Sequence, residues 1–272
     1  MSSQDGLLVV EGPSDARFWR APGRAACDLV IADGKSNVVK CIERLDAKRV
    51  EGVLGVVDDD YASLKRLIRG SENAPESENL VTTEVRDLEC LLWRSSAFET
   101  VLAEYGDPSK IAAVERTFRV DIRTRVVSLA LVFGGLRCAA QVFDLDIDVS
   151  AIKIPQFLHR KTWTLDIEGL WSAVVGEDKS IKQSIKQKLL SCCTSELRSV
   201  DPWLVIRGHD VTEIMRLGLK NRFGDRQRRA GADKISTVLR TSFRSSELRS
   251  TRLWMNICNW QDRNPGFSVV VP

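Results

Sequence analysis

The sequence predicts an α/β fold: a parallel sheet flanked by helices in the first hundred residues, followed by a helix-rich, basic region. Two observations carry this prediction. Short apolar runs alternate with amphipathic stretches of helical period, which is the pattern of a parallel, doubly wound sheet. The charge also changes along the chain, because residues 1–178 contain 22 Lys and Arg against 29 Asp and Glu, whereas residues 179–252 contain 17 against 7.

Four apolar runs are expected to form the strands of the sheet. They are residues 7–10, 28–32, 53–57 and 80–83. Each is short enough for a buried strand and is followed by polar or turn-forming residues, such as Gly12-Pro13 after the first run.

Helices are expected between these strands and after them. The pattern predicts helices from about Asp15, from Ser36 or Asn37 to Ala47, from Tyr61 to Arg69, from Asp87 to Tyr105, and over residues 109–142 and 179–222. Residues 144–168 are expected to form short strands and turns. A change of character near residues 105–108 predicts a metal-binding catalytic domain over 1–107 and a helix-rich region for substrate or partner binding over 108–272. A continuous fold is equally compatible with the pattern.

The composition excludes several classes of protein. With 43% hydrophobic and 28% charged residues, the chain has the composition of a globular protein. The longest apolar run, 126–133, is too short to cross a bilayer, so no membrane association is expected. The start of the chain has no basic segment of a secretory signal. Seven scattered cysteines without a C-x-x-C pair argue against a disulfide framework or a zinc site, so a cytoplasmic location is expected.

Acidic side chains follow the predicted strands, at the edge where parallel sheets bind their ligands. They are Glu11, Asp15, Asp58, Asp60, Asp87 and Glu89. Carboxylates that converge repel one another unless a cation neutralises them. Oxygen donors without His or Cys suit Mg²⁺ or Mn²⁺, and two such ions roughly 4 Å apart can stabilise both oxygens of a phosphodiester displacement. The alternative is that the aspartates only cap the next helix. Asp59 should point away if Asp58 and Asp60 point inward.

Basic residues supply a second set of candidates, for contact with a polyanion. Lys35 follows Gly34, but Leu29 stands where a phosphate-binding loop of the Walker A type needs Gly, so we expect no ATP hydrolysis. The segment from Arg216 to Arg229 is the densest basic stretch of the chain. The nucleic-acid-binding candidates are Lys35, Arg222, Arg226, Arg228 and Arg229. The alternative is an ordinary solvated surface.

Two strings carry a resemblance to a known family. Val9-Val-Glu-Gly-Pro-Ser-Asp15, followed by Gly55-Val-Val-Asp-Asp-Asp60, resembles the TOPRIM signature of topoisomerases, DnaG-type primases, small ribonucleases and OLD-family nucleases. The Glu11/Asp15 spacing and the Asp87-x-Glu89 pair resemble the OLD type.

Further strings are similar to a narrower group within that family. Asp33-Gly-Lys-Ser-Asn37 and Arg207-Gly-His-Asp210 occur in the order of the AriB-like TOPRIM effectors of the PARIS anti-phage defence systems. The TOPRIM motifs cover about residues 7–90.

The resemblance implies a nuclease that depends on two Mg²⁺ or Mn²⁺ ions. Glu11 would bind one ion and position or activate water, Asp58 and Asp60 would hold metal, and Asp15 and Glu89 would support a second ion. The resemblance further implies cleavage of RNA, such as tRNA, or DNA in antiviral defence, control by an ABC-type ATPase and action as a homodimer.

Some points stay open at this stage. OLD-type enzymes use a basic residue near the scissile phosphate, for which Lys153, Lys161 and Lys35 are candidates. Two other functions also remain as alternatives. One is an enzyme like a primase or topoisomerase, and the other is a catalytically inactive module that docks an ATPase or another partner through its acidic crevice.

Overall fold

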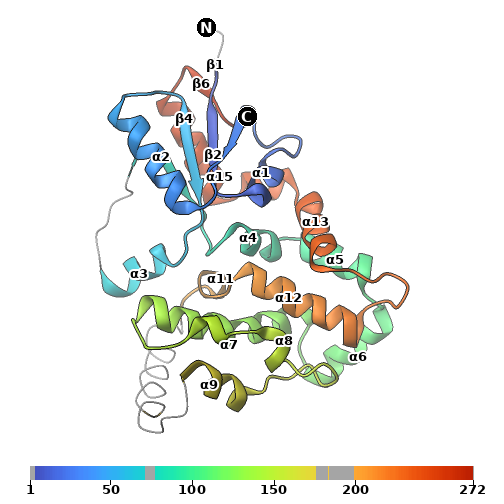
Figure 1. Ribbon diagram of the computed structural model, residues 1–272. Helices are drawn as coiled ribbons and strands as arrows, with labels where there is room; N and C mark the ends of the chain where they lie inside the picture. The colour runs from blue at the N-terminus through green and yellow to red at the C-terminus, as the bar shows by residue number, and fades with distance from the viewer. Residues whose placement is uncertain (1–3, 71–76, 176–182, 184–198, 272) are drawn as a thin grey trace.

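The computed structural model describes residues 4–70, 77–175, 183 and 199–271 (Figure 1). Its elements, in chain order, are β1 (Gln4–Asp5), β2 (Leu7–Val10), α1 (Pro13–Trp19), β3 (Asp28–Ile31), α2 (Lys35–Ala47), β4 (Val53–Val57), α3 (Ala62–Arg69), β5 (Leu80–Thr82), α4 (Leu88–Arg94), α5 (Ala97–Tyr105), α6 (Pro108–Phe118), α7 (Ile122–Val142), η1 (Val149–Ala151), α8 (Ile154–Phe157), α9 (Ile167–Val175), α11 (Pro202–Val205), α12 (Gly208–Gly218), the π-helical turn η3 (Leu219–Phe223), α13 (Ala232–Ser242), α14 (Ser245–Arg249), α15 (Arg252–Arg263) and β6 (Phe267–Ser268).

The central feature is a four-stranded parallel sheet in the order β3-β2-β4-β5, which confirms the predicted α/β class and the four predicted strands. The register places Val10 beside both Ile31 and Val56. The residues that follow β2 and β4 therefore emerge together at the carboxyl edge of the sheet. In Figure 1 this edge faces a thick helical layer, with α4 between the sheet and the other helices.

The two faces of the sheet are covered by different helices. Val9 and Val53 pack against Val38 and Ile42 of α2. Leu8, Val10, Leu54 and Val56 point to the other face and belong to the main core, which also contains Phe18 and Trp19 of α1. That core continues into α7, α12 and α15, so it includes residues on both sides of the predicted boundary at 107/108.

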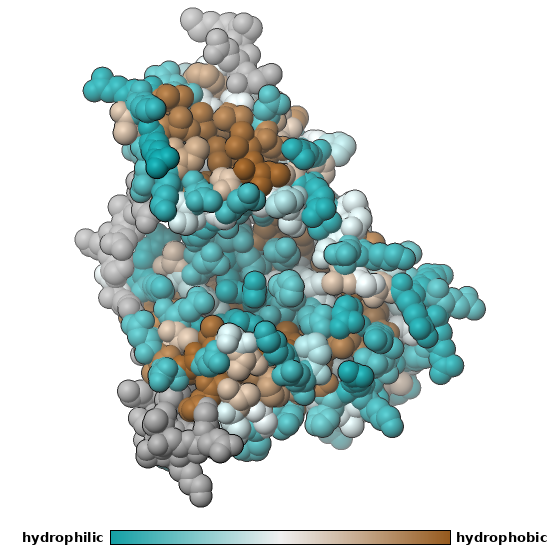
Figure 2. All heavy atoms as spheres, in the orientation of Figure 1, coloured by the Kyte–Doolittle hydropathy of each residue, from teal (hydrophilic) through white to brown (hydrophobic). Residues whose placement is uncertain are grey.

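The edge strand β3 is less covered than its neighbours. Val30 is 42% exposed and Ile31 is 36% exposed, and they lie on opposite faces of the strand. Figure 2 shows hydrophobic side chains gathered over the sheet on the drawn face, with hydrophilic ones across the middle of the molecule.

The helical part differs from the sequence predictions at three places. The helix predicted over 87–105 divides at Ser95–Ser96, and the one over 109–142 divides at residues 119–121, where Arg119 is left-handed (φ 57°) and Asp121 caps α7. The prediction of short strands over 144–168 is wrong apart from one bridge between Leu158 and Leu165. Asp and Pro residues start short helices there, because a capping carboxylate and a fixed φ favour a helical turn.

The predicted helix over 179–222 falls only partly on described residues. Residues 179–182 and 184–198 lie outside them, while α11, α12 and η3 are helical as expected.

Helix α7 is the one described helix that is long and apolar enough to cross a membrane by length and composition. Half of its most apolar window is buried inside the protein, and ten of its residues, including Val126 and Phe133, are buried. Helix α7 thus packs as a core helix of the described fold.

Adjacent glycines in α7 give a matched test of this packing. A Cβ at Gly134 would lie 2.6 Å from the carbonyl oxygen of Val205 and 2.9 Å from the Cα of Ile206, whereas a Cβ at Gly135 would meet nothing within 4 Å. We expect Gly134→Ala to destabilise the protein by about 2 kcal/mol, because backbone must move. Gly135→Ala should stabilise it by roughly 0.5–1 kcal/mol through helix propensity. Urea denaturation measures both, and equal effects would contradict the close packing of α7 and α11.

Candidate functional site

The candidate site begins with Glu11 and Asp58, which directly follow the neighbouring strands β2 and β4. The backbone N–H of Asp58 donates to Oε1 of Glu11 at 2.6 Å. Oδ1 of Asp58 in turn accepts from the N–H of Leu88, the first residue of α4, at 2.9 Å. These bonds fix both carboxylates against the carboxyl edge of the sheet.

Two further carboxylates come from the first turns of helices that start at this edge. Asp15 in α1 accepts from the N–H of Gly12 at 2.9 Å, which turns its side chain back towards the strand end. Glu89 lies in the first turn of α4 and is half-buried. The structure therefore places three of the predicted metal ligands, Glu11, Asp15 and Asp58, around one pocket. Glu89 does not line this pocket, but it is close enough to Asp15 and Asp58 to interact with them electrostatically.

A small pocket lies between these elements. Glu11, Asp15, Asp58 and Thr83 supply its polar wall, and its apolar wall consists of Trp19, Val56, Val57 and Leu88. Its cavity volume is about 10 Å³, which is room for about one water molecule or small ion.

The electrostatics of the pocket favour protonated carboxyl groups when no cation is present. Burial is the largest cause that raises the pKa of Glu11, Asp15, Asp58 and Glu89. Repulsion by neighbouring carboxylates adds to it: burial, with repulsion from Asp87 and Glu11, raises the pKa of Asp58 well above its usual value. The pKa of Glu89 rises from 4.5 to about 7.

The chemistry of this donor set fits a hard divalent cation. Within the described residues, one oxygen of Glu11 and one of Asp58 receive no hydrogen bond, and a cation would relieve the repulsion among the four carboxylates. The ligand shell is not assembled in advance, because no three described His, Cys, Asp or Glu side chains form a group that could hold a metal as they stand.

The three consecutive aspartates have three different environments. Asp59 is fully buried and accepts from the N–H and the hydroxyl of Ser63 in α3, so it points away from the pocket as predicted. Asp60 is exposed, has a left-handed backbone (φ 48°) and lies at the rim, where its carboxylate is 3.6 Å from Nζ of Lys35. The structure places this predicted ligand beside Lys35 and not in the pocket wall.

Lys35 is the predicted basic residue that lies at the site. It is the first residue of α2, after the turn at Gly34 (φ 115°). Its Nζ donates to the carbonyl oxygens of Asp58 and, at 3.2 Å, of Asp59. The ammonium group is thus held beside the strand end that carries Asp58.

Asp87 and Arg86 support the site next to the pocket residue Leu88, and the sequence motifs did not reveal these roles. Asp87 is buried and caps α4 through the N–H of Cys90 at 2.8 Å, and it also accepts from the N–H of Gly208 at 3.0 Å. Arg86 is buried, stacks on the ring of Tyr61 at 4.4 Å and lies 3.7 Å from Asp87. Nε and Nη1 of Arg86 have no hydrogen-bond partner in the described structure.

Thr83 also lines the pocket, and the sequence motifs did not identify it as a site residue. Its hydroxyl accepts from the N–H of Asp59 at 2.9 Å and donates to the carbonyl of Val85. Its position directly after β5 follows the same strand-end rule that singled out Glu11 and Asp58, so the rule could have found it.

Gly208 brings the later part of the chain to the pocket. A Cβ on this residue would lie 2.3 Å from Cβ of Glu89 and 2.6 Å from Oδ1 of Asp87. Helix α12 therefore begins directly on the first turn of α4. Two residues on, buried Asp210 pairs with Arg137 at 3.1 Å, while His209 is exposed.

The remaining basic candidates lie away from the carboxylates, around the loop between η3 and α13. Arg222 is half-buried and its Nη1 donates to the carbonyl of Lys161. Arg228 lies 3.7 Å from Asp225, and Arg226 and Arg229 are exposed. The other candidates for a basic residue near a scissile phosphate, Lys153 and Lys161, are exposed, and neither lines the pocket.

A scan of the chain against known protein families finds no match, and a search of curated proteins finds no similar sequence.

The raised pKa values predict an unusual dependence of stability on pH. A carboxyl group with a higher pKa in the folded state binds more protons there, so the folded state loses stability as pH rises through that interval. For Glu89 the interval runs from about 4.5 to about 7. We expect metal-free protein to lose up to about 3 kcal/mol through this group across that interval. Glu89→Gln should remove that part of the slope in urea denaturation with EDTA. Glu43→Gln, an exposed change on α2, is the control, and a slope unchanged by Glu89→Gln would contradict the assignment.

Proposed function

We propose that this protein is a metal-dependent phosphodiesterase that cleaves nucleic acid. One observation carries the proposal: Glu11, Asp15, Asp58 and Glu89 gather at the carboxyl edge of a parallel sheet, and the pKa of each is raised. Keeping four unneutralised carboxylates together destabilises the folded chain, and such an arrangement is expected where a cation or a catalytic proton is used.

The carboxylates of the site would bind the metal ions that act on the substrate. Glu11 and Asp58 would ligate Mg²⁺ or Mn²⁺ with their unbonded oxygens, and Asp15 and Glu89 would support a second ion. A bound divalent ion polarises the phosphate and makes a water molecule acidic enough to attack it. The backbone N–H groups of Asp58 and Leu88 fix one oxygen of Glu11 and one of Asp58, so the other oxygens of these two residues and the side chains of Asp15 and Glu89 would move to complete the ligand shell.

Lys35 and Asp60 would act at the rim of the pocket. The ammonium group of Lys35 is within reach of a phosphate that approaches the metal ligands, and Asp60 holds it there through their ion pair. Because this lysine is on the first turn of α2, a short side-chain movement is enough to exchange Asp60 for a substrate oxygen.

The biological setting of the proposal rests on the resemblance alone. A TOPRIM nuclease of the OLD type, similar to the effectors of PARIS defence systems, would be a cytoplasmic toxin against infected cells. It would be held inactive by an ABC-type ATPase and would act as a homodimer on RNA or DNA.

One observation favours a second candidate function. The ligand shell is not assembled, and the amine of Lys35 already lies beside the strand that carries Asp58. A basic segment of a partner protein could therefore occupy the acidic crevice of a catalytically inactive module. In that case nucleic acid would stay intact with either metal, and calorimetry would detect no divalent ion bound.

Asp58→Asn separates these functions. The amide retains an oxygen that can accept from Leu88, but it removes a charge from the cluster. Without divalent ions at pH 8, we expect the variant to be more stable than wild type by about 1–3 kcal/mol. With Mg²⁺ or Mn²⁺, it should lose cleavage of RNA and DNA and should lose calorimetric metal binding.

The control is Asp33→Asn, an exposed change directly beyond β3 at the same edge of the sheet. Its backbone is left-handed (φ 55°), a conformation that Asn tolerates. Wild-type cleavage and metal binding by the Asp58 variant would disprove the proposed metal site.

A further inference from the structure

We propose that the loop between η3 and α13 is a second binding position for the polynucleotide backbone, beyond the end of helix α12 that lies away from the carboxylate pocket. The loop spans residues 224–231 and is called the basic tip below. The inference rests on the proposed function and deepens it, because it requires a substrate long enough to reach from the pocket to the basic tip.

Helix α12 sets the distance between the two positions. Its first residue, Gly208, donates to Asp87, which caps α4 next to the pocket residue Leu88, and η3 continues from its last turn to Phe223. Gly208 and Gly218 are ten residues apart, so at 1.5 Å per residue α12 spans about 15 Å. Figure 1 shows α12 leading away from α4 to the loop at the edge of the molecule.

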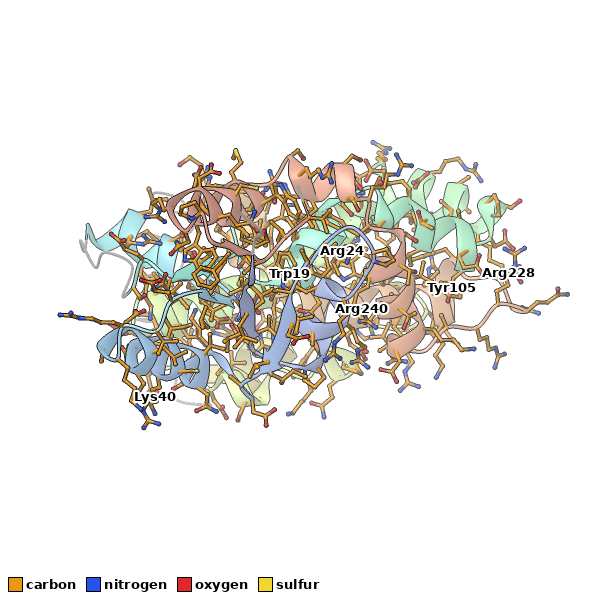
Figure 3. The ribbon with its side chains drawn as sticks, turned by 90° about the horizontal axis from the view of Figure 1, so that it is seen from above. Trp19, Arg24, Lys40, Tyr105, Arg228 and Arg240 are labelled. Atoms are coloured by element: carbon orange, nitrogen blue, oxygen red, sulfur yellow. The ribbon has the colours of Figure 1, made fainter. Side chains whose placement is uncertain are left out.

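Helix α13 returns from the basic tip to the pocket. It begins at Ala232, directly after the tip, and packs against α12 and α4. Near its end, Arg240 lies close enough to Glu89 and Arg17 to affect their electrostatics. Viewed from above in Figure 3, Arg240 lies between Trp19, which lines the pocket, and Arg228 of the tip. Cationic groups thus occur at both ends of α13.

The basic tip is held firmly at its base. The N–H of Asp225 donates to the carbonyl of Tyr105, and Nζ of Lys110 donates to the carbonyl of Gly224, both bonds close to 2.9 Å. Phe223, the last residue of η3, is fully buried against Trp163. A backbone fixed in this way presents its side chains without a large loss of entropy on binding.

The charges of the basic tip are available to a polyanion. Among the described residues, Arg226 and Arg229 make no ion pair and are exposed. Arg228 lies 3.7 Å from Asp225 and donates to the carbonyl of Glu104 at 3.3 Å, and its side chain is 56% exposed. Two unpaired guanidinium groups on a fixed loop can bind successive phosphates, whereas a surface that binds an apolar partner would present hydrophobic side chains.

The spacing sets a minimum length for a substrate that uses both positions. Phosphates of one strand of a duplex advance by about 3.4 Å per base pair, so the roughly 15 Å of α12 corresponds to about five base pairs. A duplex or stem longer than that can contact the tip while one phosphate lies at the pocket.

The test is binding of fluorescein-labelled nucleic acid by anisotropy, in EDTA so that no cleavage occurs. The probes are a 20-bp duplex and a four-nucleotide strand, each as RNA and as DNA. The variants are Arg226→Gln/Arg229→Gln and the control Lys40→Gln/Arg44→Gln, whose residues are exposed on α2. Figure 3 places Lys40 at the opposite end of the molecule from Arg228.

The tip variant should bind the duplexes roughly tenfold more weakly at 50 mM salt, and the slope of log affinity against log salt should fall by about 2. The short strands have successive phosphates that the tip can bind, so their weaker binding should also fall in the tip variant. Binding by the control variant should stay at the wild-type value. The inference is overturned if the tip variant binds the duplexes like wild type or if both variants lose affinity equally. A difference between the RNA and the DNA probes would show which backbone the tip binds more tightly.

The Asp58→Asn variant separates this inference from the proposed function. Asp58→Asn leaves the tip intact, so it should bind the duplexes like wild type while failing to cleave them. If Asp58→Asn still cleaves nucleic acid, the proposed metal site is wrong. The duplex-binding measurement on the tip variant then still tests whether the basic tip binds nucleic acid. Wild-type cleavage with no loss of duplex affinity in the tip variant counts against the tip alone.

Discussion

Mutual repulsion among carboxylates at one edge of a parallel sheet is the constraint on which the rest of this structure depends. Parallel strands deliver their following residues to the same edge, and here those residues include Glu11 and Asp58 on neighbouring strands. Helices α1 and α4 start at the same edge and add Asp15 and Glu89. Burial raises the free energy of every ionised form in the cluster. The chain must therefore hold the groups together by other interactions.

It does so with backbone N–H groups and with close approach of distant segments. The amides of Gly12, Asp58 and Leu88 each bond one carboxylate of the cluster. Two other acids are kept out of the pocket, because Asp59 binds Ser63 and Asp87 binds the starts of α4 and α12. The contact at Gly208 is so close that a side chain there would collide with Glu89. The metal-binding candidates and the helical layer are thus parts of one packing arrangement.

Local patterns were sufficient to predict the sheet. Alternating runs predicted the four strands, and the strand-end rule placed Glu11 and Asp58 at the same edge, where they are hydrogen-bonded to each other. The same rule could not separate Asp60 from Asp58, because in the left-handed turn that carries Asp60 to Lys35 the N–H of Asp60 donates to the carbonyl of Arg86, which comes from elsewhere in the fold. The role of Asp87 depends on Gly208, which is 121 residues away. The breaks between α4 and α5 and between α6 and α7 depend on capping groups, and the spacing of hydrophobic residues does not predict where these groups end one helix and begin the next.

The short parallel pair β1–β6 has a practical consequence. Gln4 lies beside Phe267 and Asp5 beside Ser268, so the described chain starts on the side of the sheet where β2 begins. The carboxylates lie at the other edge, where β2 ends. Beyond β6 the chain runs on through buried Val269 and Val270, and the N–H of Val271 donates to the carbonyl of Arg24. A dye or a surface linker joined at the start of the described chain would therefore lie away from the pocket, whereas the segment after β6 is part of the core.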